Sequence, residues 1–173
     1  MRKPKIFISY HRADKKYKDK IVSMLRERHY NYYEVDENTS FNGLKHQNIA
    51  SQICAKVDDC DVLLCIVGKE TFSRPHVDWE LHAALKGDVK SRKGIIAVML
   101  ENRQDNKNDI DLNTFPTKLQ ENMDYIVLEQ YATISGRIDY AVNLAENNRR
   151  DRRLQITHRN PVMELKSGLY FDN

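Results

Sequence analysis

The stretch "DVLLCIVG", residues 61–68, decides the fold class of this 173-residue chain. Its apolar run lies between an aspartate and a glycine and is far too short to span a bilayer. A short run that is apolar throughout, without alternation, is typical of a strand covered on both faces. We therefore expect residues 61–68 to form a central strand of a parallel sheet with helices on both sides.

Four further strands and four helices are predicted around this central strand. The strand-like runs lie at 5–10, 32–36, 94–100 and, with a weaker pattern, 124–129. Helical spacing of apolar residues predicts helices at about 14–28, 43–57, 74–85 and 132–149. Strands that alternate with helices form right-handed βαβ units. The predicted fold is therefore α/β, a flavodoxin-like three-layer sandwich with a mainly parallel five-stranded sheet.

Composition fits one soluble domain with an appendage. The chain is 40% hydrophobic and 31% charged, and the apolar part of its N-terminus is too short for a signal peptide. We expect a cytoplasmic protein without membrane contact, with a domain at 1–150 and a C-terminal tail at 151–173. The polar segment 101–118 is predicted to be a mobile surface loop, because the ligand spacing and central glycine of a calcium loop are missing.

Neither a metal site nor a nucleic-acid site is predicted. Cys54, Cys60 and Cys65 show no CxxC spacing, which argues against a disulfide framework and a structural zinc site. We expect all three cysteines to pack in the core. The net charge is +3, and the dense basic cluster at 149–153 is expected to be a solvated helix end rather than a nucleic-acid patch.

Polar residues gather where the predicted strands end. The sequences after the first three strands are "SYHRAD" (9–14), "DENTSFNG" (36–43) and "GKETFSRPH" (68–76). Ligands of open parallel sheets bind at the carboxyl ends of the strands, and helix N-termini at that edge favour phosphates. These segments therefore bring hydroxyls, aromatic rings, an arginine and carboxylates to one rim.

Glu80 belongs to the helix that follows the third of these segments, in "RPHVDWELHAAL", residues 74–85. At about 100° per residue it falls beside Val77 and Ala84, at the border of the apolar stripe. We expect it to be neither fully exposed nor deep in the core, and the nearby helix N-terminus to favour its ionised form. From helical geometry alone, a flanking carboxylate without a catalytic role is favoured.

"KIFISYHRADK" (5–15) and "VLLCIVGKETFSRPHVDWEL" (62–81), with a loop after "VD" and the inferred strand order, resemble a Toll/interleukin-1 receptor (TIR) domain. The resemblance covers about residues 4–148. More narrowly, the chain resembles the TIR-like proteins of bacterial Thoeris anti-phage systems. The resemblance implies an NAD⁺ glycohydrolase or cyclase that makes a cyclic or modified ADP-ribose signal, with Glu80 as the catalytic residue and NAD⁺ as substrate rather than cofactor. It also implies self-association and a separate downstream effector.

A single carboxylate suits this chemistry. Nicotinamide leaves the ribose as a neutral molecule, so the leaving group needs no proton. A negative group that stabilises an oxocarbenium-like ribose is therefore sufficient. Where water is excluded, a nucleophile of the substrate itself can capture the ribose and give a cyclic product.

The substrate-binding candidates lie at the three strand ends and on the following helix. Tyr10 could stack on a ring or only pack, and Arg12 could pair with a phosphate or remain an exposed charge. Ser73 could bind ribose or phosphate or only cap the helix. Members of the family commonly have a tryptophan four residues before the glutamate, where this chain has His76. The complete set is Ser9, Tyr10, His11, Arg12, Asp36, Phe41, Gly68, Thr71, Ser73, His76 and Trp79.

Three other classes share parts of this pattern. A non-catalytic TIR module that works by self-association or partner docking needs neither Glu80 nor a substrate pocket. A response-regulator receiver shares the fold but needs an acidic cluster after the first strand, where this chain reads "SYHR". A nucleoside deoxyribosyltransferase shares both the fold and the glutamate chemistry and remains a minor enzymatic alternative.

Overall fold

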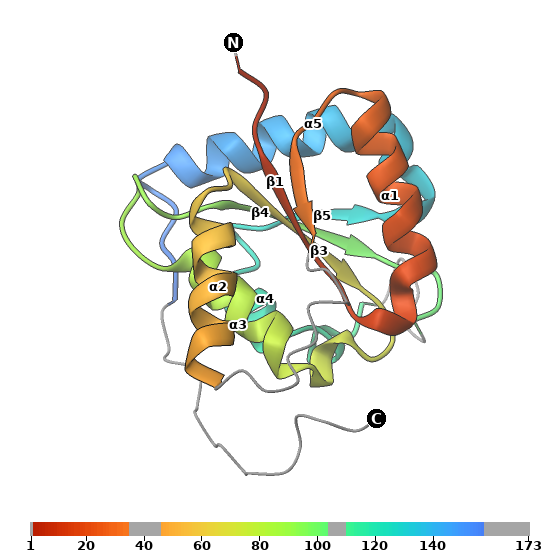
Figure 1. The fold of residues 1–173 in the computed structure, drawn as a ribbon, viewed down its shortest axis with the longest axis horizontal. Coiled ribbons are helices and arrows are strands. Elements are labelled where there is room, and N and C mark those ends of the chain that lie inside the picture. The colour runs from red at the N-terminus through yellow and green to blue at the C-terminus, as the bar shows by residue number, and fades with distance from the viewer. Residues whose placement is uncertain (1, 35–45, 104–109, 158–173) are drawn as a thin grey trace.

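Five parallel strands form a sheet in the order β2-β1-β3-β4-β5. The computed structural model describes residues 2–34, 46–103 and 110–157 (Figure 1). The strands are β1 (Ile6–Ser9), β2 (Tyr32–Glu34), β3 (Val62–Val67), β4 (Gly94–Met99) and β5 (Val127–Gln130). Every residue of β1, β3 and β4 is buried, as strands covered on both faces require. The predicted parallel five-stranded sheet is confirmed.

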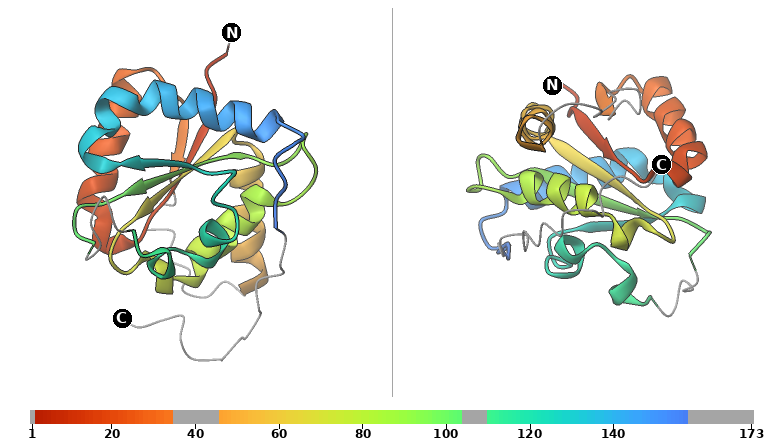
Figure 2. Two further views of the ribbon diagram at one scale, coloured as in Figure 1. Left: turned by 180° about the vertical axis from the view of Figure 1, so that it is seen from behind. Right: turned by 60° about the horizontal axis from the view of Figure 1, so that its bottom comes forward.

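Helices cover both faces of this sheet (Figures 1 and 2). They are α1 (Lys15–Glu27), α2 (His46–Asp58), α3 (Pro75–Leu85), α4 (Thr117–Gln120) and α5 (Tyr131–Arg150). On one face α1 and α5 pack on the strands, where Leu25 and Val142 join Leu64 in one buried cluster. On the other face α2 and α3 lie side by side, and Leu81 packs with Leu63. The three layers confirm the predicted flavodoxin-like sandwich. None of the described helices is long and apolar enough to cross a membrane.

Three short turns escaped prediction: η1 (Arg12–Asp14), η2 (Thr71–Ser73) and η3 (Leu112–Thr114). Such 3₁₀ turns contain too few residues for helical periodicity to reveal them. The turn η3 lies beside Phe115, whose side chain is 1% exposed. The guanidinium of Arg103 lies over the Phe115 ring, 4.3 Å from the ring centroid. The prediction of a surface position is therefore wrong for Phe115, whereas Leu112 and Asn113 are exposed as expected, and the predicted mobility stays a prediction. Residues 104–109 lie outside the described residues.

Two further predictions need correction. β5 begins at Val127 rather than at Asp124, because the backbone N–H groups of Tyr125 and Ile126 donate to the carbonyls of Asn122 and Met123 in a turn, at 2.9 Å and 3.4 Å. Cys54 is exposed, whereas the other two cysteines are buried as expected. It directly follows the buried residue Ile53, and one helical step of about 100° turns it away from the sheet.

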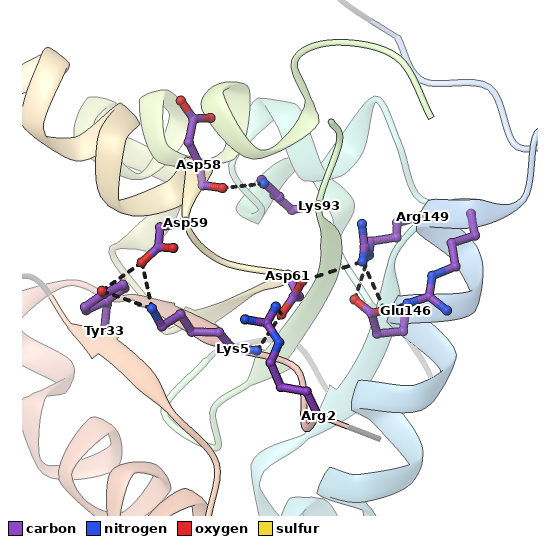
Figure 3. A network of polar contacts seen from close by, with 10 residues as sticks. Arg2, Lys5, Tyr33, Asp58, Asp59, Asp61, Lys93, Glu146 and Arg149 are labelled. Atoms are coloured by element: carbon purple, nitrogen blue, oxygen red, sulfur yellow. Dashed lines mark hydrogen bonds and ion pairs between the residues drawn. The ribbon is translucent and has the colours of Figure 1, made fainter. Parts of the chain in front are cut away.

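Ion pairs join the segments at the amino ends of the strands (Figure 3). Lys5 Nζ lies 2.6 Å from Asp59 Oδ2. Asp61, just before β3, lies 3.6 Å from Arg149 of α5, which also pairs with Glu146 at 2.6 Å. The side chain of Arg149 is only 15% exposed. The prediction of a solvated helix end is therefore wrong for this arginine, because it ties α5 to the start of β3.

Arg92, just before β4, anchors the segment that follows α5. Its side chain is buried, and its guanidinium donates to the backbone carbonyls of Arg149 and Leu154 at 2.8 Å, of Asp151 at 2.6 Å and of Asn148 at 3.3 Å. The last carbonyls of a helix lack partners within the helix, and the guanidinium supplies donors to them. Residues 151–154 therefore pack against the domain, and a tail that begins at residue 151 stays a prediction.

Candidate functional site

Glu80 lies on α3 against the strands β1 and β3. The Glu80 side chain is 2% exposed. Glu80 and the Ser9 hydroxyl are both close enough to Cys65 to change the pKa of its thiol. Ser9 ends β1 and is the register partner of Cys65 on β3, so these side chains lie together. Burial and the neighbouring Glu80 raise the pKa of the Cys65 thiol, which keeps the thiol protonated. We call Ser9, Cys65 and Glu80 the Glu80 site.

The carboxyl group of Glu80 is deeply buried, which favours its protonated form. Burial raises its pKa from 4.5 to about 8, and the nearby Ser9 hydroxyl has a smaller, opposite effect. Among the described residues, neither Ser9 Oγ nor Glu80 Oε2 has a hydrogen-bond partner. Loss of water around a carboxylate outweighs the attraction of a helix N-terminus. The predictions of a border position and an ionised form are therefore wrong.

Asp14 joins the ends of the three strands β1, β3 and β4. Its carboxylate is 2% exposed and accepts a hydrogen bond from Asn102 Nδ2, beyond the end of β4, at 3.1 Å. It lies against Gly68, where an added Cβ would be 2.7 Å from Asp14 Cγ. Thr71 Oγ1 accepts from the Gly68 backbone N–H at 2.9 Å and donates to the Ile66 carbonyl at 3.3 Å. The predicted binding residues Gly68 and Thr71 thus hold the β3 end in shape.

The turn η2 and the start of α3 place Arg74 and His76 close to His11. Burial lowers the pKa of His11, and it lowers the pKa of His76 to about 4. The positive charge of Arg74 lowers the pKa of both histidines further. Arg74 Nη2 pairs with Glu70 Oε2 at 2.6 Å, while its Nε is buried without a partner among the described residues. Ser73 is exposed and donates to the Glu70 carbonyl at 2.9 Å, so it does not cap α3.

The remaining candidates lie in different surroundings. Tyr10 is 8% exposed and belongs to the core cluster beneath α1 and α5, which favours the packing interpretation over ring stacking. Arg12 is exposed in η1, and Trp79 is half-buried on α3 next to Glu80. Asp36 and Phe41 lie outside the described residues. Among the described residues, the structure therefore brings together candidates from the first and third strand ends.

Two residues of this region were not predicted, Asp14 and Arg74. Asp14 stands in "SYHRAD" without any spacing that separates it from an ordinary helix-start carboxylate. Arg74 occupies the N-cap position of α3 and directly precedes Pro75. Serine, threonine, aspartate and asparagine are the usual residues at that position, so an arginine there is a signal that could have identified it.

The arrangement suits a substrate that carries or develops positive charge. A buried carboxyl with an unpaired oxygen can donate a proton, or it can stabilise a neighbouring cation once it ionises. A cation placed beside Glu80 would lower its pKa and favour the ionised form. In the part of the chain that the structure describes, no group of three or more histidine, cysteine, aspartate or glutamate side chains could hold a metal ion.

A sequence profile and a solved structure are similar to this chain. The sequence profile of the TIR domain matches residues 6–133, which include all five strands and Glu80. Comparison with curated proteins gives no match. One similar solved structure is that of the TIR domains in the activated Roq1 resistosome directly recognizing the pathogen effector XopQ. It has a TM-score of 0.47 and 11% sequence identity, over 84% of this chain and 83% of that chain.

Proposed function

The chain belongs to the TIR domain family, and from this premise we propose that it cleaves NAD⁺ with Glu80 as the catalytic residue. The observation that carries the proposal is the Glu80 carboxyl, which is 2% exposed and has an unpaired Oε2 among the described residues. A buried polar atom without a partner destabilises the fold, so its presence calls for a functional reason. A non-catalytic TIR module, the alternative function, gives no such reason.

In the proposed reaction the nicotinamide ribose lies against Glu80. The positive charge of the nicotinamide ring favours the carboxylate over the carboxylic acid. When the bond between C1′ and the ring nitrogen breaks, its electron pair leaves with neutral nicotinamide and the positive charge moves to the ribose. The carboxylate stabilises that charge. Water then adds to C1′ and releases a proton to give ADP-ribose, or a nucleophile of the substrate adds instead and gives a cyclic product.

The surrounding side chains have separate tasks in this proposal. We assign Ser9 to the ribose hydroxyls, because its own hydroxyl is close enough to Glu80 to lower the pKa of that carboxyl. His76 and Trp79, both half-buried on the same helix, would contact the nicotinamide ring. His76 stands where the family commonly has a tryptophan, so a smaller, neutral ring replaces part of the pocket wall.

The proposal extends to the biological setting through the resemblance of "KIFISYHRADK" and "GKETFSRPHVDWEL" to Thoeris proteins. In that setting the product is a cyclic or modified ADP-ribose that activates a separate effector in the cytoplasm of a phage-infected cell. Self-association of TIR domains would be the trigger for activity. These assignments concern the product and the partners, and they depend on NAD⁺ cleavage itself.

Mass spectrometry of reaction mixtures tests the proposal directly. Purified protein at high concentration is incubated with NAD⁺, and nicotinamide and all ADP-ribose species are quantified. We expect the wild type to release nicotinamide and Glu80→Gln to reduce the rate by at least about a hundredfold. Glu101→Gln, which neutralises an exposed carboxylate just beyond β4, is the matched control and should retain the wild-type rate.

Two results would contradict the proposal. Equal nicotinamide release by wild type and Glu80→Gln would remove the catalytic assignment. Absence of nicotinamide release at concentrations where light scattering shows self-association would favour the non-catalytic TIR module.

A further inference from the structure

The helix α3 begins with an unusual residue for its position. Arg74 is the N-cap, Pro75 follows as the first helical residue, and no side chain caps the helix in the described structure. Backbone N–H groups in the first turn of a helix have no partners within the helix and attract anions. A helix N-terminus alone is common, so the neighbouring side chains decide whether a ligand binds there.

His11 supplies the second, independent observation. Its side chain is only 6% exposed, and its Nδ1 atom has no hydrogen-bond partner among the described residues. Arg74 Nε is likewise buried and unpaired. Buried polar atoms are normally hydrogen-bonded, so two unpaired nitrogens near one helix end point to a ligand. Arg74 Nε needs a hydrogen-bond acceptor, and His11 can donate to the same ligand in the tautomer that carries its proton on Nδ1.

The charges near these nitrogens favour a negative ligand. Arg74 is close enough to His11 and to His76 for its positive charge to act on both rings. Glu70 pairs with Arg74 at 2.6 Å and also acts on His11, so a carboxylate already lies beside this group. The Arg74 side chain is 38% exposed and the Glu70 side chain 55% exposed, so an incoming anion can replace this carboxylate.

We infer that Arg74 and His11, at the N-terminus of α3, form the subsite for the pyrophosphate of a dinucleotide whose ribose lies at Glu80. The inference rests on the proposed function, since Glu80 defines where the ribose lies. Arg74 and Glu80 are six residues apart on α3, about 9 Å along the helix axis. A ribose joined to a pyrophosphate can span such a distance. Arg74, rather than Arg12, is then the arginine that binds phosphate.

Binding to a catalytically inactive protein tests this subsite. In the Glu80→Gln background, isothermal titration calorimetry measures the affinity for ADP-ribose and, separately, for nicotinamide riboside, which has no pyrophosphate. Arg74→Gln should weaken ADP-ribose binding about tenfold or more, because a charge-assisted hydrogen bond is lost. It should change nicotinamide riboside binding less than about twofold. Arg152→Gln, which alters an exposed arginine far along the chain, should change neither affinity.

A second variant gives a gain of affinity, which a folding defect cannot imitate. Glu70→Gln removes the carboxylate that competes for Arg74, and ADP-ribose should bind several-fold more tightly. Unchanged ADP-ribose affinity in Arg74→Gln would overturn the inference, as would a loss in Arg12→Gln without one in Arg74→Gln. These binding results do not require turnover. Failure of NAD⁺ cleavage and failure of the pyrophosphate subsite are therefore separate outcomes.

Discussion

The carboxylate of Asp14 occupies the place where a side chain at Gly68 would begin: an added Cβ would lie 2.7 Å from both Asp14 Cγ and Oδ1. Asp14 is held there from the other side by Asn102. The ends of β1, β3 and β4 are therefore fastened to one another through the Asp14 carboxylate. A residue larger than glycine cannot be added at position 68 without moving this carboxylate.

Gly68→Ala should destabilise the fold by about 2 kcal/mol, because the new methyl group must displace a buried carboxylate. Chemical denaturation of wild type and variant measures the difference in the free energy of unfolding. Gly136→Ala is the matched control, since Gly136 is exposed in α5 and nothing lies within 4 Å of an added Cβ. That change should stabilise the protein by about 0.5–1 kcal/mol. Equal effects of the two substitutions would contradict the packing at Gly68.

Glu80→Gln should stabilise the fold increasingly between pH 4.5 and pH 8. The folded pKa of about 8 exceeds the ordinary value of 4.5, so the folded state keeps a proton that the unfolded state releases. The wild type therefore loses stability as pH rises through this window, whereas the glutamine variant cannot titrate. The gain should be on the order of 3 kcal/mol at pH 7 and vanish near pH 4. A pH series of denaturant titrations on both proteins checks this, and parallel curves would disprove the raised pKa.

The kcat/KM for NAD⁺ cleavage should rise with pH and level off above pH 8. The reacting form needs an ionised Glu80, and the pKa of about 8 belongs to the free enzyme, which kcat/KM reports. In the complex the cationic nicotinamide ring stabilises the carboxylate, so the kcat profile should level off at a lower pH. Initial rates at limiting and saturating NAD⁺ separate the two profiles. A kcat/KM that falls as pH rises towards 8 would be incompatible with a catalytic carboxylate.

Arg92→Met should cost about 3 kcal/mol, because four backbone carbonyls lose a buried charged donor. Amide hydrogen exchange should accelerate selectively in residues 151–157. Arg152→Met serves as control, since it removes an exposed arginine of the same segment and should leave both quantities unchanged. Uniform acceleration across the domain, without a local effect, would show that Arg92 does not anchor this segment.

The sheet could be predicted because its three central strands, β1, β3 and β4, are buried on both faces, and short runs that are apolar throughout are typical of such strands. Residues Val62–Val67 are all buried, as their pattern requires. The five parallel strands and the two helical layers follow from the alternation of these runs with helical spacing. The apolar pattern does not give the start of β5, because the backbone of Tyr125 and Ile126 makes turn bonds to residues before the strand.

The environment of Glu80 could not be predicted, for a physical reason. Helical spacing gives the direction of a side chain around its own axis, whereas burial depends on what lies opposite. Ser9 and Cys65 come from other strands, and their positions follow only from the register of the sheet. The same limit applies to Arg74 and His11, whose proximity depends on the short turn η2. The site is formed by contacts between segments that are far apart in the sequence, and the periodicity of a single segment cannot predict such contacts.

The contact made by Arg92 restricts sequence variation at position 92 but not at the residues whose carbonyls it binds. Its guanidinium recognises main-chain oxygens only, so residues 148, 149, 151 and 154 can change identity without losing this contact. Position 92 has no such freedom, since lysine has one donor group on a flexible stem and cannot present the same planar fork. Homologues that retain this arrangement should therefore keep arginine before β4, while the contact itself sets no requirement on the side chains of the residues that it holds.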